Sequence, residues 1–307
     1  MKSLADAAKQ YLCLRRALGY KLHHHTWWLP DFVSFLQAHG SAVITTELAV
    51  KWACQPPDAS PNWWSKRLSA VRQFARHHHA SDPRTQIPPT DLIPYRKQRV
   101  TPHLYSADEV ATLMAEASHL SPPLLAASYA TLIGLLAATG MRVSEALDLN
   151  RDDVDCKRQL LTVYSGKFGK SRYVPLHPTT VEALRHYARK RDRLRPHRTS
   201  SAFFLSSTGS RVLLQNFGHV FIRLLKHTAV GRGCPRRPRI HDLRHTFAMK
   251  LVRDWYRAGV DVERRLPWLS TYLGHVSPVS TYWYLTATSD LLAAACVRAE
   301  RAWKQRS

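Results

Sequence analysis

Three side chains between residues 142 and 244 have the types and spacing that cleavage of a phosphodiester would need. Arg142 lies in LAATGMRVSEALDL, where one helix is expected to end at Gly140 and an amphipathic helix to begin. Arg244 lies in PRRPRIHDLRHTFAMKLV, three residues after His241 and on the same face of an expected helix. A guanidinium binds two phosphate oxygens at once and keeps its charge. The pattern indicates fixed positive charge beside an imidazole, although Arg142 could instead be a surface residue paired with Glu145.

The sequence also offers candidates for a proton donor and a nucleophile. Lys167 lies in SGKFGKSRYVPL, with its alternative Lys170 on the same expected turn. His275 precedes VSPVSTYWYL, which contains Tyr282 and Tyr284. A tyrosine with its ordinary pKa of about 10 is a weak nucleophile at neutral pH, so it needs a base or a strongly positive environment. On a helix these two tyrosines point to different faces, and their spacing does not decide which of them would react.

A zinc site is the competing interpretation of HDLRH. His241 and His245 are one helical turn apart, and Asp242 stands where the acid of an HExxH site would be. Arg244 inside the motif would repel a metal ion, and no third ligand is evident downstream, so a zinc hydrolase is the weaker hypothesis. The five cysteines are far apart and never form a CxxC pair, which argues against a disulfide framework and a thiolate zinc site.

The composition indicates a folded protein with a polyanionic partner. The 307 residues include 45 Lys and Arg against 22 Asp and Glu, which gives a net charge of +23. Such a field attracts nucleic acid, whose phosphates it neutralises. The uncharged run at 120–141 approaches the length of a membrane span, but prolines and small residues favour a helix in a globular core. With no apparent secretory signal and no disulfide pattern, we expect a protein of the reducing cytoplasm with no membrane association.

The spacing of apolar residues and a proline-rich segment divide the chain into two expected domains. Apolar residues recur at helical spacing between Leu4 and about His79, which predicts four short helices in a domain of residues 1–82. Residues 83–102 are rich in proline and basic residues and are expected to form a linker. The second domain, 103–307, begins at YSADEVATLM, where Ser106 and Glu109 predict a capping box. It is mainly helical, with two strands expected in LLTVY and RYVPL.

The order of the motifs resembles the tyrosine recombinase family, of the phage integrase and Xer type. The resemblance covers about residues 100 to 300 and consists of Arg142 in TGMRVSEAL, Lys167 in GKFGKSRYVPL, His241 and Arg244 in HDLRHTFA, His275 in LGH, and a tyrosine nine residues later. It implies a mainly α fold with a small β-sheet, in the two-domain architecture of that family. A helical SAM-like core-binding domain would precede a mixed α+β catalytic domain.

The resemblance also implies a role for each residue. In the family the nucleophile lies nine residues after the LGH histidine, which selects Tyr284 and leaves Tyr282 as the alternative. Tyr284 would attack a DNA phosphate, form a 3′-phosphotyrosine and release a 5′-hydroxyl, without a cofactor or a metal. His241 would act as the base, and Lys167, with Lys170 as its rival, as the acid. Glu145 would orient Arg142. The residues that would bind the phosphoryl oxygens are Arg142, Arg244 and His275.

The implied partner is double-stranded DNA, and the implied process is integration, excision or transposition of DNA by a site-specific recombinase. The final stretch SDLLAAACVRAERAWKQRS is an expected amphipathic helix. In this family such a tail often docks on a neighbouring protomer, which implies a homo-tetramer on two DNA sites, alone or with related recombinases; docking within the same chain is the alternative. The alternative is a catalytically inactive, sequence-specific DNA-binding protein of the same fold.

Overall fold

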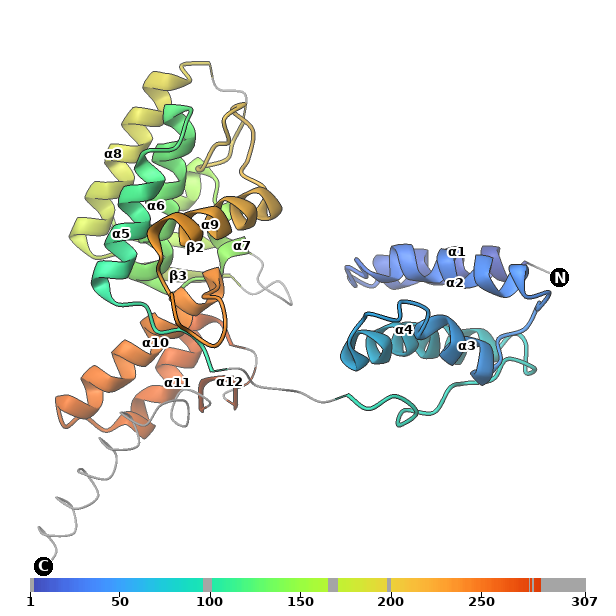
Figure 1. The fold of residues 1–307 in the computed structure, drawn as a ribbon. Coiled ribbons are helices and arrows are strands. Elements are labelled where there is room, and N and C mark those ends of the chain that lie inside the picture. Colours follow the sequence, from blue (N-terminus) through green and yellow to red (C-terminus); the bar gives the residue numbers. More distant parts are fainter. Residues whose placement is uncertain are drawn as a thin grey trace, which may run out of the picture. The chain divides into compact units, whose positions relative to one another are not determined.

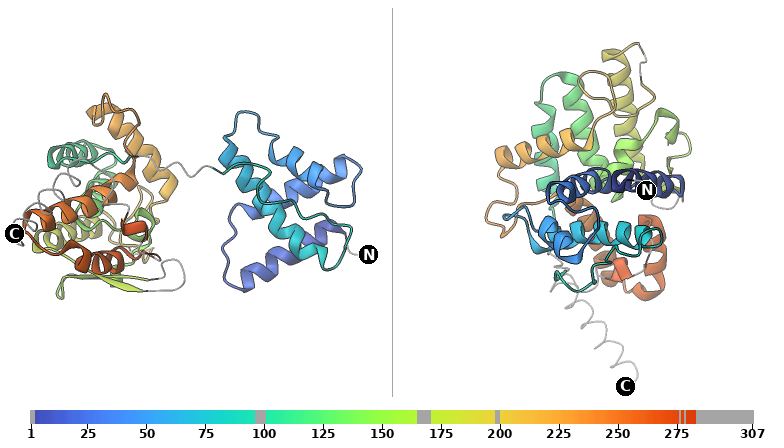
Figure 2. Two further views of the ribbon diagram at one scale, coloured as in Figure 1. Left: turned by 90° about the horizontal axis from the view of Figure 1, so that it is seen from below. Right: turned by 90° about the vertical axis from the view of Figure 1, so that its right-hand side faces the viewer.

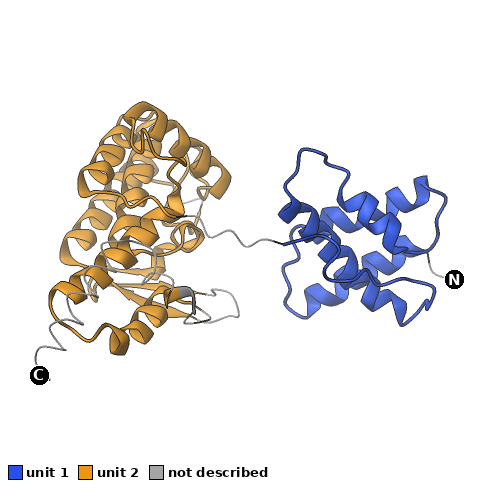
Figure 3. Cartoon of the chain, turned by 60° about the horizontal axis from the view of Figure 1, so that its bottom comes forward, with its two compact units in different colours: residues 1–99 blue, residues 100–307 orange. Residues whose placement is uncertain are grey.

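The computed structural model describes residues 3–95, 101–164, 171–197, 200–275, 277 and 279–282. The chain forms two compact units, Met1–Arg99 and Val100–Ser307 (Figure 3). Most of the described residues are helical, and the second unit contains a small sheet (Figure 1). The expected mainly α fold with a small β-sheet is therefore confirmed.

The described part of the first unit contains the four helices that the periodicity predicts. They are α1 (Leu4–Ala17), α2 (His25–Ala38), α3 (Thr46–Ala53) and α4 (Pro61–His79). The hydroxyls of Ser3 and Thr45 accept hydrogen bonds from backbone N–H groups in the first turns of α1 and α3, so polar residues start both helices. Phe32, Trp52 and Phe74 are fully buried between the helices, so large aromatic side chains form this small core.

The first part of the segment expected to be a linker packs on the first unit. Arg72 of α4 donates hydrogen bonds to the carbonyls of Pro88 and Pro89, at 2.7 and 2.6 Å. The backbone N–H of Gln86 donates to the carbonyl of Ile44, and the side chain of Ile93 is buried in the core of the unit. Residues 83–95 are thus held along the helices, while residues 96–100 lie outside the described residues.

The second unit surrounds a long apolar helix, α6 (Pro123–Thr139), which lies side by side with α5 (Ala107–Ser118) and α8 (Pro178–Leu194) (Figures 1 and 2). The run at 120–141 is thus a buried core helix, as expected. No helix in the described part of the chain is long and apolar enough to cross a membrane. The remaining helices are α7 (Val143–Asp148), the 3₁₀ turn η1 (Arg151–Asp153), α9 (Leu214–Thr228), α10 (Ile240–Arg257), α11 (Val262–Leu273) and α12 (Val279–Tyr282).

The sheet is antiparallel, in the order β1 (Val154–Asp155), β2 (Leu160–Val163) and β3 (Arg172–Pro175). Strands β2 and β3 correspond to LLTVY and RYVPL, so both predicted strands are confirmed. Their register pairs Val163 with Arg172 beside the connecting turn. The turn itself, residues 165–170, lies outside the described residues.

The predicted capping box opens α5 and forms part of a contact with α10. The Ser106 hydroxyl accepts from the N–H of Glu109, whose carboxylate accepts from the N–H of Ser106. The N–H of Tyr105 donates to the hydroxyl of Thr246, and the Tyr105 hydroxyl donates to the carbonyl of Arg239. The segment before α5 is therefore tied to the amino-terminal half of α10.

Gly140, where α6 ends, has no room for a side chain. Its φ of +61° is in the left-handed region, and an added Cβ would collide with the ring of Phe247, whose Cγ would lie 2.8 Å away. We expect Gly140→Ala to lower the free energy of unfolding of the second unit by about 2 kcal/mol or more, from backbone strain and overpacking together. Urea denaturation followed by circular dichroism measures the change.

Gly218 in α9 provides the matched control, because an added Cβ there has no neighbour within 4 Å and its φ is not in the left-handed region. Gly218→Ala is expected to raise the stability slightly, by up to about 1 kcal/mol, since alanine is the better helix former. Equal effects of the two substitutions would contradict the assignment of strain to Gly140.

Candidate active site

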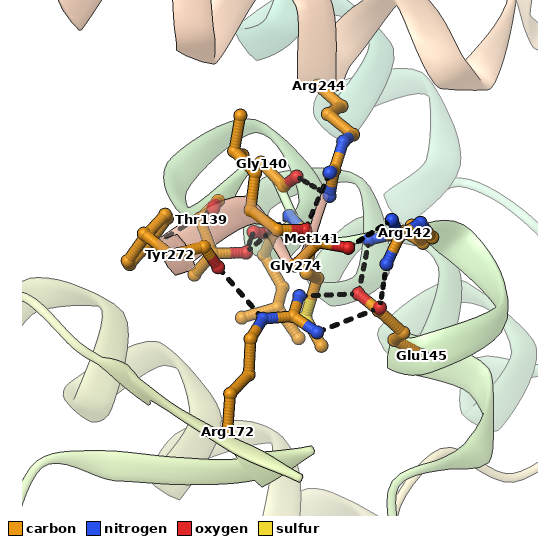
Figure 4. Close-up of polar contacts among 11 residues, drawn as sticks. Thr139, Gly140, Met141, Arg142, Glu145, Arg172, Arg244, Tyr272 and Gly274 are labelled. Atoms are coloured by element: carbon orange, nitrogen blue, oxygen red, sulfur yellow. Dashed lines mark hydrogen bonds and ion pairs between the residues drawn. The ribbon is translucent and has the colours of Figure 1, made fainter. Parts of the chain in front are cut away.

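Arg142 lies between the end of α6 and the start of α7, where its guanidinium is held from two sides. Its Nη1 donates to Oε1 of Glu145 at 2.7 Å, and its Nη2 donates to the carbonyl of Gly274 at 2.6 Å (Figure 4). The backbone N–H of Arg142 donates to the other carboxylate oxygen of Glu145 at 2.8 Å. The side chain is one-third exposed. Arg142 thus pairs with Glu145, as the surface interpretation expects, but it also contacts the LGH segment.

Arg172, at the start of β3, is a residue of this site that the sequence interpretation missed. Its Nη1 and Nη2 donate to the two oxygens of Glu145 at 2.9 and 2.8 Å, and its Nε donates to the carbonyl of Tyr272 (Figure 4). A signal existed, because side chains alternate along a strand and Arg172 shares its face with the buried Val174. An arginine on the inward face of a strand needs a buried acid partner, and here that partner is Glu145.

The carboxylate of Glu145 is therefore clamped between two guanidinium groups. Burial by itself would raise the pKa of this carboxyl, but hydrogen bonds and charge from Arg172, followed by those from Arg142, lower the pKa to about 2. Glu145 remains ionised throughout the neutral range. It balances part of the positive charge and fixes the planes of both guanidinium groups.

Arg244 is buried in the second turn of α10 and joins two helix ends. Its Nη1 donates to the carbonyl of Gly140 after α6, at 3.0 Å, and its Nη2 donates to the carbonyl of Leu273 at the end of α11, at 2.6 Å (Figure 4). Unpaired carbonyls at a helix carboxyl end attract a cation, which explains this placement. Because Gly274 accepts from Arg142, the two arginines hold adjacent carbonyls of the LGH segment.

His241 and His275 lie close enough to the arginines for the positive charge to affect both imidazoles. Burial, and then the charge of Arg244, lowers the pKa of His241. Burial, followed by Arg244 and Arg142, lowers the pKa of His275 to about 4. The Nδ1 atom of His275 lies 2.7 Å from the hydroxyl of Thr281 on α12. Both imidazoles are therefore largely neutral at pH 7. The structure thus brings together four of the predicted site residues, Arg142, His241, Arg244 and His275.

The other proposed catalytic residues lie outside the described residues. These are Lys167 with its alternative Lys170, and the proposed nucleophile Tyr284. Tyr282, the alternative nucleophile, is the last residue of α12, and about half of its surface is exposed.

The structure gives HDLRH contacts that do not resemble a metal site. The Asp242 carboxylate accepts from the backbone and the side chain of Arg239, so it caps the start of α10. The rings of His241 and His245 are edge to face, with centroids 4.7 Å apart. Burial, followed by the charge of His241, lowers the pKa of His245 to about 4. Within the described ranges no three His, Cys, Asp or Glu side chains form a group that could hold a metal ion.

This arrangement can bind and polarise a tetrahedral oxyanion. Two fixed guanidinium groups provide charge-assisted donors, and two neutral imidazoles nearby can each donate or accept a proton. Donors held in place before the reaction stabilise developing charge without the cost of reorganising water. The geometry is suited to phosphoryl transfer.

Comparisons with known proteins identify the family of this chain. The model of the phage integrase family matches residues 104–290. A putative integrase/recombinase (y4rB) of Sinorhizobium fredii is 41% identical over 314 residues, which cover 100% of both chains. The tyrosine recombinase XerD of Vibrio cholerae is 29% identical over 85% of this chain and 80% of its own. The fold and these relatives define a tyrosine recombinase. The chain belongs to the phage integrase family, which confirms the resemblance of its motifs.

Solved structures show the same fold at lower identity. The integrase of transposon Tn1549, in complex with transposon right end DNA, superimposes with a TM-score of 0.67 at 15% identity, over 98% of this chain and 99% of that one. A lambda integrase dimer bound to a COC′ core site gives a TM-score of 0.61 at 18% identity, over 90% and 96% of the two chains. These likenesses show that the fold is that of known integrase structures.

The clamped carboxylate predicts how stability depends on pH. Because the pKa of Glu145 is lowered from 4.5 to about 2 by folding, its contribution is fully present above about pH 4.5 and is lost as the pH falls towards 2. The shift corresponds to about 3 kcal/mol. Glu145→Gln should therefore remove a large part of the loss of stability that the wild type shows over this range. Urea denaturation at several acidic pH values measures the free energy of unfolding of the wild type and of Glu145→Gln. If that free energy depends on pH in the same way in both proteins, the carboxylate is not held between the two guanidinium groups.

Proposed function

We propose that this chain is a site-specific DNA recombinase that cleaves and rejoins the strands of duplex DNA through a 3′-phosphotyrosine at Tyr284. The observation that carries the proposal is the convergence of Arg142, His241, Arg244 and His275 on one positively charged site, in a chain of the phage integrase family. The proposed reaction is the integration, excision or transposition of a DNA segment.

The arginines are the proposed binding groups for the scissile phosphate. A guanidinium has five N–H donors, and among the contacts of the described residues the Arg142 side chain uses one on Nη1 and one on Nη2. Its partial exposure leaves the remaining donors accessible to a phosphate that enters from the solvent. Glu145 prevents the guanidinium from turning away, so the donors are already oriented when DNA binds.

His241 and His275 have different proposed roles, one as the base and the other as a hydrogen-bond donor. The lowered pKa of His241 keeps its imidazole neutral, so it can accept the proton of the attacking tyrosine. When the Thr281 hydroxyl donates to Nδ1 of His275, the imidazole proton stands on Nε2 and can be donated to a phosphoryl oxygen. In this role a neutral His275 acts as a hydrogen-bond donor, and Arg142 and Arg244 supply the charge.

In the proposed cleavage step the phenolic oxygen of Tyr284 attacks the phosphorus, and its proton passes to His241. The bond from phosphorus to the 5′-oxygen breaks. Lys167, with Lys170 as the alternative, protonates the departing 5′-oxygen. A 5′-hydroxyl from another duplex reverses the step, and because the phosphodiester energy is retained in the tyrosine ester, rejoining needs neither ATP nor a metal ion.

Duplex DNA is the proposed partner of both units. The net charge of +23 supports this role, because each phosphate contact gains free energy from the release of counterions. The solved structures of the Tn1549 and lambda integrases are complexes with DNA. Residues 1–82 are the proposed core-binding domain and 103–307 the catalytic domain. The basic segment 83–102 would contact the DNA backbone between them.

A homo-tetramer on two DNA sites is the proposed assembly. The second unit has a cleft of about 650 Å³ between α5, α6, α8 and α10, lined largely by apolar side chains such as Val110, Leu135 and Leu251. The carboxyl-terminal sequence SDLLAAACVRAERAWKQRS has an amphipathic pattern that suits such a cleft. We place this segment in the cleft of a neighbouring protomer, so that the contacts close into a ring. Related recombinases could take part in the same assembly.

Covalent trapping tests the proposed nucleophile. The substrate is a duplex with the native flanking sequence of the element, nicked near the candidate site so that the released strand diffuses away. The wild type and Tyr282→Phe are expected to form a protein–DNA adduct that survives denaturation and is unaffected by EDTA. Tyr284→Phe should form none but should bind DNA as tightly as the wild type, because the phenolic hydroxyl is needed only for attack.

Three other outcomes of the trapping experiment would each support a different account of the protein. An adduct with Tyr284→Phe that disappears with Tyr282→Phe would move the nucleophile to Tyr282. A reaction that EDTA abolishes would refute the metal-free mechanism. Tight binding to the native site with no adduct from any variant would refute the enzymatic proposal in favour of a DNA-binding protein of the same fold.

A further inference from the structure

A second cluster of reactive side chains lies outside the proposed active site, where the loop between α9 and α10 meets the start of α5. The Sγ atom of Cys234 is 3.5 Å from Nδ1 of His103, whose Nε2 is 3.1 Å from both carboxylate oxygens of Glu109. Cys234 is exposed to solvent, whereas the side chains of His103 and Glu109 are 14% and 26% exposed. A thiol, an imidazole and a carboxylate thus stand in line.

The order of the contacts determines where the protons stand. The carboxylate of Glu109 can only accept a hydrogen bond, so it holds the imidazole proton of His103 on Nε2. In the neutral imidazole the lone pair of Nδ1 then faces Cys234, and the thiol is the donor in the contact between them. This is the arrangement in which an imidazole removes the proton of a thiol and a carboxylate stabilises the resulting cation.

The imidazole is also fixed by its surroundings. Glu109 accepts the N–H of Ser106 in the capping box of α5, which holds the carboxylate in place. The ring of Tyr105 packs edge to face against that of His103, with centroids 4.7 Å apart. A base held in this way loses little conformational entropy when it takes up the proton.

The backbone around Cys234 is held in a defined turn. The N–H of Cys234 donates to the carbonyl of Gly231, and Pro238 packs against Gly231 so closely that a side chain there would collide with it. The exposed thiol is therefore presented from a fixed position beside His103.

We propose that Cys234 is a nucleophilic thiol, with His103 as its base and Glu109 as the residue that orients His103, and that it undergoes exchange with low-molecular-weight disulfides. His103 takes the proton from Sγ, and the thiolate attacks one sulfur of the disulfide. A bond forms between Sγ and that sulfur while the original S–S bond breaks. The second sulfur leaves with the electron pair and takes the proton from His103. The cysteine is oxidised to a mixed disulfide, and half of the reagent is reduced to a thiol.

This modification site goes beyond the proposed recombinase chemistry and does not depend on it. The loop leads directly into α10, which carries His241 and Arg244. A group attached to Cys234 would therefore be placed next to the helix that supports two residues of the proposed active site.

The test compares two exposed thiols of the same chain. One variant of the full chain keeps only Cys234 and a second keeps only Cys13, which is exposed on α1, with the other cysteines changed to serine. The probe is dithiodipyridine, an uncharged disulfide, and its release is followed by absorbance. At about pH 6 we expect Cys234 to react about five times faster than Cys13, because His103 lies in place to accept the thiol proton as the sulfur attacks.

Two substitutions separate the proposed base from a structural contact. His103→Gln should reduce the rate of Cys234 to that of Cys13 at pH 6, and the difference between Cys234 and Cys13 in the protein with His103 should disappear at high pH, where attack by a thiol needs no base. Glu109→Gln keeps an acceptor for the capping box and should reduce the rate by a smaller factor. Incubation of the protein with glutathione disulfide should place the first adduct on Cys234 by mass spectrometry. Equal rates for Cys234 and Cys13 at pH 6, or an unchanged rate in His103→Gln, would overturn the proposal.

Discussion

The contacts of one buried carboxylate, Glu145, with two arginines organise the second unit. Glu145 joins Arg142, at the start of α7, to Arg172, at the start of β3, and both arginines reach on to carbonyls of residues 272–274. Three segments far apart in the sequence are thus joined through Glu145 and the two arginines that bind it. A buried carboxylate is costly unless it is paired and hydrogen-bonded, so these contacts favour this arrangement of the segments.

Two glycines allow the arginine side chains to come close to the backbone at the ends of α6 and α11. Gly140 and Gly274 both have positive φ angles, and each gives up its carbonyl to an arginine, Gly140 to Arg244 and Gly274 to Arg142. A Cβ on Gly274 would lie 2.9 Å from Nη1 of Arg172. The TG and LG steps of the sequence are therefore structural requirements of the site. They let helices end where guanidinium groups can reach the last carbonyls.

The positive charge of this site acts on its histidines. Burial, followed by the charge of Arg244 and other nearby arginines, lowers the pKa of His241 and that of His275, so both imidazoles are largely neutral at pH 7. In the proposed reaction, guanidinium groups that are already held in place would stabilise the charge that develops on a phosphodiester without the cost of reorganising water.

Local patterns in the sequence predicted the local structure. The spacing of apolar residues gave the four helices of the first unit, and Ser106 with Glu109 gave the capping box, because each depends on residues only a few positions apart. The order of motifs identified the family. Arg172, the packing of residues 83–95 and the contact of His103 with Cys234 escaped prediction, since each depends on partners that only the folded chain brings together. For Arg172 the alternation of β3 offered a signal, but the identity of its partner on α7 did not follow from it.

The central claim is that Arg142 neutralises charge on the scissile phosphate, and a substrate of altered charge tests it most directly. A nicked duplex is made with a methylphosphonate at the cleavage site, which replaces one charged non-bridging oxygen by an uncharged methyl group. Arg142→Ala should fail to form the covalent adduct on the normal phosphate but should regain much of its activity on the methylphosphonate, because the charge it would have neutralised is absent. Equal inactivity on both substrates would contradict the claim and leave Arg142 a purely structural role.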